Sequence, residues 1–430
     1  MMSVESSWVS ASARTLRGAR FETTAAVIAT VLIGIDIRLP FNAPTSVIIG
    51  TVLFPVVFPA AYRYRWFLGF VALVVATVGW GLFMSAQSAE PSSTSLAVAQ
   101  CLRVLNLVFA LAVLLWARGR LGIAHTVLAF AGGMLLGVPL SGIHALNPWK
   151  FDLGLPLTLI ALSLPLVYRK RIPQIVTGCV LIAINVLFSS RSAAGFVLIA
   201  VALGLTGGSA AVAVARRSKK WLALRYAQVV AAAAGAYFLL QGAILEGMLG
   251  EGIQERTQAQ ISAGGSALVG GRPEMGASIA LITANPWGYG AGALPTPSQI
   301  LIAKGGMARL GYDPNNGYVE QYMFGTSFEV HSTIGDLWVT FGIPGAILAI
   351  ICLILLIGGT GNAMANGTMS TVLVYLVIRA VWDLGFSPIY TSVLLLPLAL
   401  AVIATPRHDP GGAPGSFAGG AAPFGPRTFA

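Results

Sequence analysis

Apolar runs of about twenty residues recur along most of the chain, from near residue 21 to near residue 404. An α-helix of this length crosses the hydrocarbon core of a bilayer. Charged residues make up 10% of the 430 residues, whereas soluble domains carry ~25%. The sequence therefore predicts an all-α fold, a helical bundle that crosses a membrane many times.

We predict about twelve membrane-spanning helices from the apolar runs. Their expected ranges are 21–37, 45–61, 66–86, 96–116, 121–141, 151–168, 172–188, 192–207, 221–241, 333–357, 370–385 and 387–404. The loop 358–369 contains no Lys or Arg, so the last two spans have the weakest topological support.

Basic residues gather in every second loop between these runs. Arg14, Arg17 and Arg20 precede the first run, and the later clusters are Arg63/Arg65, Arg118/Arg120, Arg169–Arg171 and Arg216–Lys220. Because loops rich in Lys and Arg stay on the cytoplasmic side, we expect both termini in the cytoplasm. The net charge of +11 then reflects topology, and nucleic acid is not an expected partner.

One loop is far longer than the rest and is predicted to lie on the outer side. It spans residues 242–329 and holds seven of the fifteen acidic residues. Long loops with structure of their own are usually functional. We therefore divide the chain into a membrane domain at 1–404, which includes this loop as the catalytic part, and a cytoplasmic tail at 405–430. The Pro, Gly and Ala content of the tail predicts disorder.

Several polar residues stand at or near the predicted outer edge of the membrane. They are Arg38, Arg191, Arg272, Arg379, His331 and Asp336. An arginine at membrane depth costs ~3 kcal/mol on insertion scales and is commonly kept to bind an anion or pair with an acid. Arg191 occupies a very short outer turn, which favours an anion ligand over a structural pair or a helix cap. Arg38 follows Asp36 closely, so an ion pair at a helix end is its alternative explanation.

Three stretches carry a resemblance to a known family. They are SSRSAAGF at 189–196, GGRPEMGASIALITANPWGYGAG at 270–292 and HSTIGDLWVTFGIPG at 331–345. In this order they resemble the motifs of the O-antigen ligase and O-antigen polymerase superfamily, which are integral membrane glycosyltransferases that use lipid-linked sugar donors. The matching residues are Arg191, Arg272, Pro286, Gly288, Gly290, Gly292, His331, Ser332, Gly342 and Gly345.

The resemblance implies an enzyme of the bacterial inner membrane that works without metal or cofactor. Its donor would be a polyprenyl-pyrophosphate oligosaccharide, its acceptor a glycan or lipid hydroxyl, and a chain-length regulator is a further implied partner. Guanidinium groups suit a departing pyrophosphate because they offer paired donors. We therefore expect Arg191, Arg272, Arg379 and Arg38 to bind substrate.

A neutral imidazole is suited to remove the proton of the acceptor hydroxyl, so His331 is the predicted catalytic base. His144, in another outer turn, is its competitor. Ser332 is expected to cap the following helix or support the site. Asp336 either favours the protonated imidazole or faces solvent. Gly288 and Gly290 either let the backbone approach a sugar or phosphate closely, or simply turn the chain.

Two other function classes stay open. A transporter or flippase of lipid-linked oligosaccharide or another anion also needs outward arginines in a helical bundle, although no inverted repeat is evident. A scaffold subunit that has lost activity is the third interpretation, because the chain departs from the family pattern at two positions. Gly276 stands where the family often has an aromatic residue, and Thr340 where it often has an acid.

Overall fold

The computed structural model describes residues 3–37, 39–205, 251–264 and 272–406, with scattered positions between 220 and 246. These residues form an all-helical bundle without strands, apart from two isolated backbone bridges. The N-terminal helices are α1 (Ser3–Ile35), α2 (Thr45–Val52), α3 (Phe54–Tyr62), α4 (Phe67–Gln87), α5 (Thr94–Ser141), α6 (Gly154–Ser163), α7 (Pro165–Arg169), α8 (Arg171–Leu187) and α9 (Arg191–Gly204). The C-terminal ones are α11 (Glu251–Gly264), α13 (Glu274–Ala284), α14 (Pro297–Ala308), α15 (Thr333–Ala365), α16 (Thr371–Phe386) and α17 (Ile389–Ile403).

Helix α5 is the centre of the bundle. It packs against α1, α2, α3, α4, α6 and α17, and its side chains supply much of the main hydrophobic core. Gly122, at φ 76° and ψ 169°, breaks α5 into two helices, which matches the two spans predicted at 96–116 and 121–141. Glycine adopts this left-handed backbone without the steric cost that a β-carbon imposes.

Among the described residues, three helices are long and apolar enough to cross a membrane, namely α4, α5 and α15. The α2–α3 pair makes a fourth if its two parts count as one span, but it bends by 89°. The span predicted at 45–61 therefore consists of two helices that meet at a sharp bend. Pro55 contributes to the break, because it has no N–H for the carbonyl one turn back and lies in the first turn of α3, where no such bond is needed.

Other predicted spans also change in detail. The one at 151–168 divides at Leu164, which is extended because Pro165 follows it. Helix α15 continues to Ala365, so most of the loop predicted at 358–369 is helical. The predicted span at 221–241 and the tail from residue 407 lie mainly or wholly outside the described residues.

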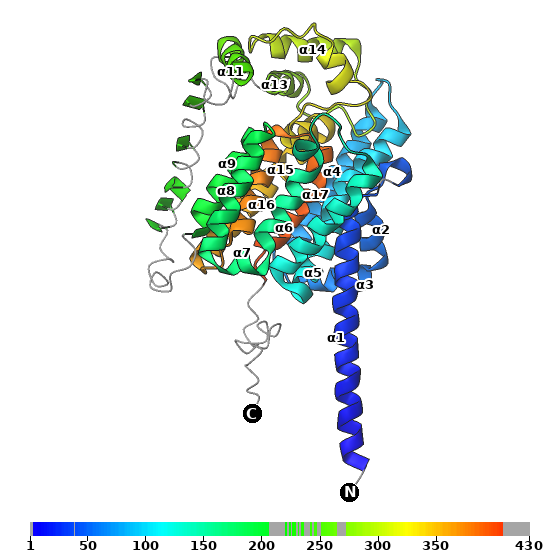
Figure 1. The fold of residues 1–430 in the computed structure, drawn as a ribbon. Helices are drawn as coiled ribbons and strands as arrows, with labels where there is room; N and C mark the ends of the chain where they lie inside the picture. Colours follow the sequence, from blue (N-terminus) through cyan, green and yellow to red (C-terminus); the bar gives the residue numbers. More distant parts are fainter. Residues whose placement is uncertain are drawn as a thin grey trace.

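The segment predicted as a long loop contains a folded helical layer. Helices α11, α13 and α14 lie together over one end of the bundle, whereas the start of α1 extends from the opposite end (Figure 1). Residues of α13, of α14, of the stretch between them and of the 319–339 segment form a second hydrophobic core: Ala277, Leu281, Ala293, Ala303, Met307, Val319, Met323, Phe324, Phe328, Val330 and Val339. We call this layer the cap.

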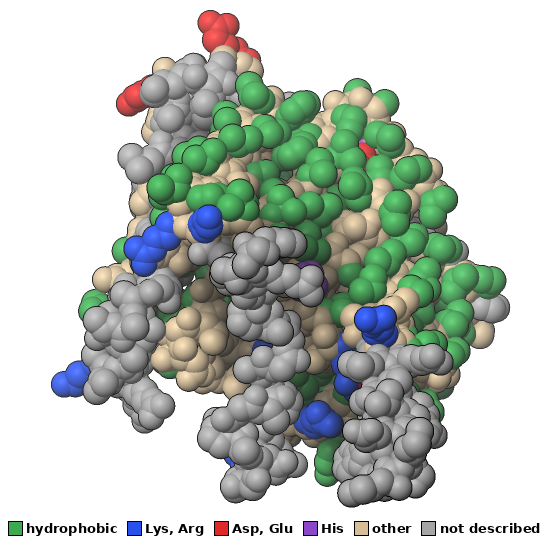
Figure 2. Space-filling model, turned by 60° about the horizontal axis from the view of Figure 1, so that its bottom comes forward, with side chains coloured by type: hydrophobic (Ala, Val, Ile, Leu, Met, Phe, Trp, Pro, Cys, Tyr) green, Lys and Arg blue, Asp and Glu red, His purple; other side chains and the backbone are tan. Residues whose placement is uncertain are grey.

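Basic residues mark the end of the bundle away from the cap. Arg120 pairs with Glu22 of α1 at 2.7 Å, and Arg118 donates to the Ala401 and Ala404 carbonyls at the end of α17. Figure 2 shows Lys and Arg side chains at this end, a broad band of hydrophobic side chains beyond them, and acidic side chains at the far end. The molecule therefore has a basic end and a cap end, separated by an apolar belt.

Candidate functional site

The site begins where α15 breaks. Gly342 has non-helical torsions inside α15, and Pro344 has no N–H to donate to Thr340. The Val339 and Thr340 carbonyls instead accept hydrogen bonds from the Tyr289 and Gly290 N–H groups, at 2.8 and 3.0 Å. The second and third motifs of the sequence are thus joined backbone to backbone.

The glycine-rich stretch continues along α4 and the start of α5. Ala291 N–H donates to the Gly81 carbonyl at 3.0 Å, and Gly292 N–H donates to Ser85 Oγ at 2.9 Å. A β-carbon on Gly290 would lie 2.7 Å from the Ser85 nitrogen. The close backbone approach expected at Gly288 and Gly290 is therefore an approach to the protein's own helices, which fixes the cap on the bundle.

Asp336 is buried, at 3% exposure, so the alternative that it faces solvent is wrong. One carboxylate oxygen accepts the Val330 N–H at 2.7 Å and the other accepts the Ile389 N–H at 2.8 Å. A buried carboxylate needs such donors to offset the loss of water. Asp336 therefore ties the residue before His331 to the start of α17.

His331 is held by its own turn. Its φ of 54° lies in the left-handed region, which is uncommon for a residue with a β-carbon. Ring Nδ1 lies 3.1 Å from the Glu329 carbonyl oxygen. Because a carbonyl only accepts, this bond requires the proton on Nδ1 and leaves the lone pair of a neutral ring on Nε2. The half-buried imidazole is thus oriented as a base.

Ser332 caps α15, as predicted, because its Oγ accepts the Gly335 N–H at 3.2 Å. Thr333 extends the contact to α16 and α17: its hydroxyl lies 3.0 Å from the Asp383 carbonyl oxygen and 2.8 Å from Ser392 Oγ. The start of α15 is therefore anchored on three sides.

Tyr318 links the histidine to the cap. Its ring lies 6.0 Å from the His331 ring, centroid to centroid, and its hydroxyl donates to Glu274 Oε1 at 2.7 Å. Burial raises the pKa of Tyr318, the Glu274 carboxylate raises it further, and the Arg272 guanidinium opposes the increase. Tyr318 therefore lies beside His331 of the third motif and is bonded to Glu274, two residues after Arg272 in the second motif.

Glu274 is 8% exposed, and its Oε2 has no hydrogen-bond partner among the described residues. The sequence assigned no role to Glu274, whereas Tyr318 belongs to the stretch 312–322 that it indicated as part of an acceptor groove. The turn-rich stretch around Tyr318 was visible in the sequence, but the partner lies 44 residues earlier, so no local pattern pairs them. Buried carboxylate oxygens normally accept a hydrogen bond, so Glu274 Oε2 is an acceptor left open beside Tyr318.

Arg272 lies over aromatic rings of α16. Its guanidinium carbon is 5.7 Å from the Trp382 ring centroid and 5.8 Å from that of Phe386, and Nη1 donates to the Phe386 carbonyl at 3.2 Å. A planar guanidinium stacks on aromatic faces while its other N–H groups stay available. This arrangement holds a fixed positive charge at the boundary between the cap and the bundle.

The other predicted arginines have different surroundings. Arg379 forms a two-point pair with buried Asp383, from Nε to the carboxylate oxygens at 2.9 and 3.0 Å. Arg191, at the start of α9, donates to Thr257 of α11 at 2.9 Å. Arg38 lies outside the described residues. Packing of Phe196 in α9 against Trp382 brings the helix of Arg191 beside the aromatic pair that carries Arg272.

His144 is a second oriented imidazole. Its Nδ1 lies 2.7 Å from Asp152 Oδ1, and its backbone N–H donates to Asp152 Oδ2 at 2.8 Å. The His144 side chain is 65% exposed, whereas His331 is half-buried beside Tyr318. The structure thus places Glu274, Tyr318 and His331 together, with Arg272 two residues from Glu274, whereas His144 contacts Asp152 and Phe151.

Comparisons of this chain with known protein families, with curated proteins and with solved structures found no match to any of them.

Proposed function

We propose that the chain is a membrane glycan polymerase or ligase of the O-antigen type. It transfers a sugar chain from a polyprenyl-pyrophosphate donor to an acceptor hydroxyl during assembly of a surface or cell-envelope polysaccharide. The observation that carries the proposal is the position of Tyr318: its ring lies 6.0 Å from that of His331, and its hydroxyl donates to Glu274, two residues after Arg272. A fixed guanidinium and an oriented imidazole are the two groups that this reaction needs.

The proposed orientation follows from charge. Loops rich in Arg and Lys favour the cytoplasmic side of the inner membrane, so the basic end lies inside with both termini. The cap then faces outward, where a lipid-linked donor presents its pyrophosphate at the membrane surface. Twelve spans remain our prediction for the full bundle, of which α4, α5 and α15 have the length and composition to cross by themselves.

In the proposed reaction the acceptor oxygen attacks the anomeric carbon of the donor sugar. A new C–O bond forms, the bond from the anomeric carbon to the pyrophosphate oxygen breaks, and the pyrophosphate leaves with the electron pair. Arg272, with Arg191 from the neighbouring helix, stabilises the negative charge that develops on the leaving group. Planar guanidinium donors serve this purpose without a metal.

The acceptor hydroxyl gives its proton to Nε2 of His331. That nitrogen carries the lone pair because Nδ1 is bonded to the Glu329 carbonyl, and no described residue bonds to Nε2. Tyr318 and Glu274 form the polar wall of the same space. Asp336, Ser332, Gly288 and Gly290 position this arrangement, and Arg379 supports it through Asp383.

The test uses the purified full chain in vesicles that contain lipid-linked glycan extracted from cells lacking this gene. We expect polyprenyl pyrophosphate to appear by mass spectrometry, together with a glycan extended or attached to its acceptor. A transporter would move the intact donor between leaflets and release no polyprenyl pyrophosphate. Transbilayer movement of the donor without bond cleavage would therefore contradict the enzyme proposal and support the transporter. If the chain neither moved nor cleaved the donor, the scaffold interpretation would be favoured.

A further inference from the structure

A cavity of about 510 Å³ lies at the basic end of the bundle, away from the cap. Arg65 and Trp66 just before α4, the second half of α15 and the end of α17 form its walls. Volumes of this size are typical of sites for small ligands. The proposed glycan transfer makes no use of this cavity.

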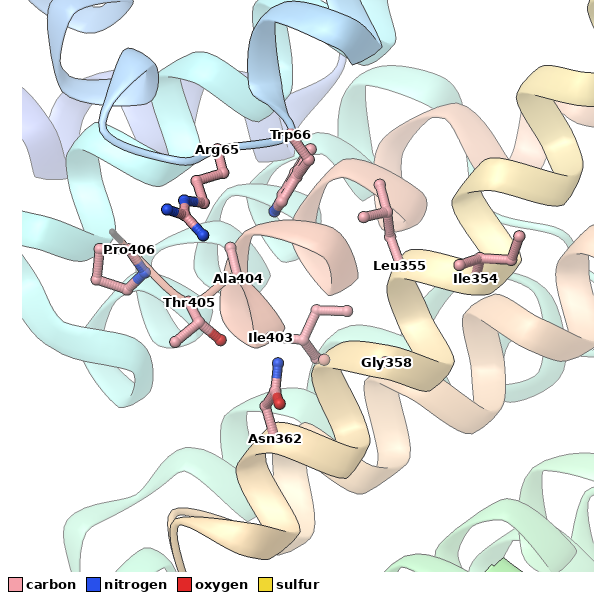
Figure 3. Close-up of a pocket in the computed structure, with 11 residues that line it drawn as sticks. Arg65, Trp66, Ile354, Leu355, Gly358, Asn362, Ile403, Ala404, Thr405 and Pro406 are labelled. Atoms are coloured by element: carbon pink, nitrogen blue, oxygen red, sulfur yellow. The ribbon is translucent and has the colours of Figure 1, made fainter. Parts of the chain in front are cut away.

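The cavity has a polar side and an apolar side. Figure 3 shows the Arg65 guanidinium and the Trp66 indole nitrogen pointing into it, with the Asn362 amide across from them. Ile354, Leu355 and Ile403 form an apolar side. An occupant must therefore carry an anionic or polar head and an apolar body.

Arg65 is available for an anion. Within the described part of the chain, no acidic side chain pairs with it and no hydrogen bond engages its guanidinium. The carbonyls at the end of α17, which would repel an anion, are covered because Arg118 donates to Ala401 and Ala404 at 2.6 and 2.5 Å. Arg118 thus removes the repulsion, and Arg65 supplies the attraction.

The position of the cavity points to a lipid. Its lining joins Arg65 and Trp66, just before α4, to apolar residues of α15 and α17, and this combination of basic, aromatic and apolar groups is typical of the level of the phosphates in a bilayer. Trp and Arg are favoured at this level because each joins an apolar body to a polar tip. Basic pockets between membrane helices on this side bind anionic lipid headgroups.

We propose that this cavity binds one anionic glycerophospholipid. The phosphate lies between Arg65 and Trp66, with the Asn362 amide as a further donor, and the first part of an acyl chain lies along Ile354, Leu355 and Ile403. The proposal is independent of the glycan transfer at the other end of the molecule.

The test compares the full chain, purified in a neutral detergent, with two arginine variants. Arg65→Ala removes the proposed ligand, and Arg63→Ala removes an exposed arginine two residues away that does not line the cavity. The probes are dioleoyl phosphatidylglycerol and dioleoyl phosphatidylcholine, and the readout is lipid retained in native mass spectra.

The wild-type chain and Arg63→Ala should retain one phosphatidylglycerol in preference to phosphatidylcholine. Arg65→Ala should bind it about tenfold more weakly, because loss of a charge-assisted contact has that size. Equal weakening by both variants would show diffuse charge attraction and would overturn the site, as would equal retention of both lipids by the wild-type chain.

Two further experiments distinguish binding of a lipid from binding of free phosphate. Gly358→Leu adds a side chain at the apolar side of the cavity, where a β-carbon on Gly358 would meet no described atom within 4 Å. It should lower retention of phosphatidylglycerol while the protein still folds. Inorganic phosphate and glycerol 3-phosphate should not displace the lipid at millimolar concentration. Full displacement by either one, or unchanged retention in Gly358→Leu, would contradict the proposal.

Discussion

Gly288 and Gly342 lie against each other backbone to backbone. A β-carbon on Gly288 would stand 2.4 Å from the Gly342 nitrogen, and one on Gly342 would stand 2.0 Å from the Trp287 carbonyl oxygen. Both residues have positive φ, at 86° and 61°. This contact is the point at which the glycine-rich stretch of the cap enters the break in α15.

We predict that Gly288→Ala and Gly342→Ala each destabilise the protein. Backbone strain alone costs about 1–3 kcal/mol for a residue forced into an unfavourable region, and the close contacts add to it. Both variants should lose folded protein at a lower temperature than the wild-type chain in a size-exclusion assay of thermal stability.

The matched control is Gly79→Ala in α4, where a β-carbon would meet no described atom within 4 Å. It should leave thermal stability unchanged or slightly higher, because alanine favours a helix more than glycine does. Wild-type stability in both Gly288→Ala and Gly342→Ala would contradict the described contact.

Asp336→Asn should damage the site through its geometry. The carboxylate accepts N–H groups from Val330 and Ile389, whereas an amide offers one acceptor and presents N–H₂ to the other donor. An unsatisfied buried group costs about 1–3 kcal/mol. A displaced base should also reduce kcat, by roughly 100-fold for a shift of about 1 Å.

The measurement for this variant is kcat and KM for the donor in the vesicle assay. We expect kcat to fall while KM changes little, since Asp336 is buried behind the site. Asp313→Asn, which alters one exposed turn, is the control and should retain activity. If the folded Asp336→Asn variant had the wild-type kcat, the proposal that Asp336 positions His331 would be wrong.

Arg272→Lys should keep the charge and lose the function. Lysine cannot stack as a plane on Trp382 and Phe386, and it lacks the paired donors for a pyrophosphate. Loss of one such stabilising group lowers transfer by about 100-fold or more. We predict the same direction for Arg191→Lys.

Arg309→Lys, at an exposed position after α14, is the control for both variants and should transfer normally. Expression and thermal stability are measured in parallel. Full transfer by Arg191→Lys and Arg272→Lys would assign these arginines to packing.

The orientation can be checked by cysteine labelling in intact cells. Cys179 is exposed and is first replaced by alanine, whereas Cys101 and Cys352 are buried. A new cysteine at exposed Ser298 in α14 should then react with an impermeant maleimide. One at exposed Thr405, beyond α17, should react only after the cells are opened. Labelling of Thr405→Cys alone would reverse the orientation.

Much of the helical pattern follows from the sequence because apolar runs are local signals. The range predicted at 66–86 matches α4 at Phe67–Gln87, and the range at 172–188 matches α8. The bend between α2 and α3 was not predicted, although Pro55 was visible. A proline is compatible with either a kinked span or two separate helices, and packing against α5 decides between them.

The site was only partly predictable. Ser332 was expected to cap α15, since a cap needs only neighbouring residues. The role of Asp336 depends on Ile389, which lies 53 residues later. The two predicted roles, support of a protonated His331 or exposure to solvent, considered only nearby residues and did not include this bond. The glycine at position 276, where the resembled family often has an aromatic residue, also depends on a distant residue. A β-carbon on Gly276 would stand 2.3 Å from the Gly306 carbonyl oxygen, so the crossing of α13 and α14 leaves no room for an aromatic side chain.

The most direct test of the account is sugar transfer by His331→Gln. Glutamine keeps a hydrogen-bonding group but cannot accept the acceptor's proton, and loss of a general base lowers rates by ~100- to 10,000-fold. We predict that the purified variant binds the lipid-linked donor, folds normally and releases polyprenyl pyrophosphate at a rate reduced to that degree, while His144→Gln retains near wild-type activity. Transfer by His331→Gln at the wild-type rate, or collapse of transfer in His144→Gln alone, would contradict the assignment of His331 as the base.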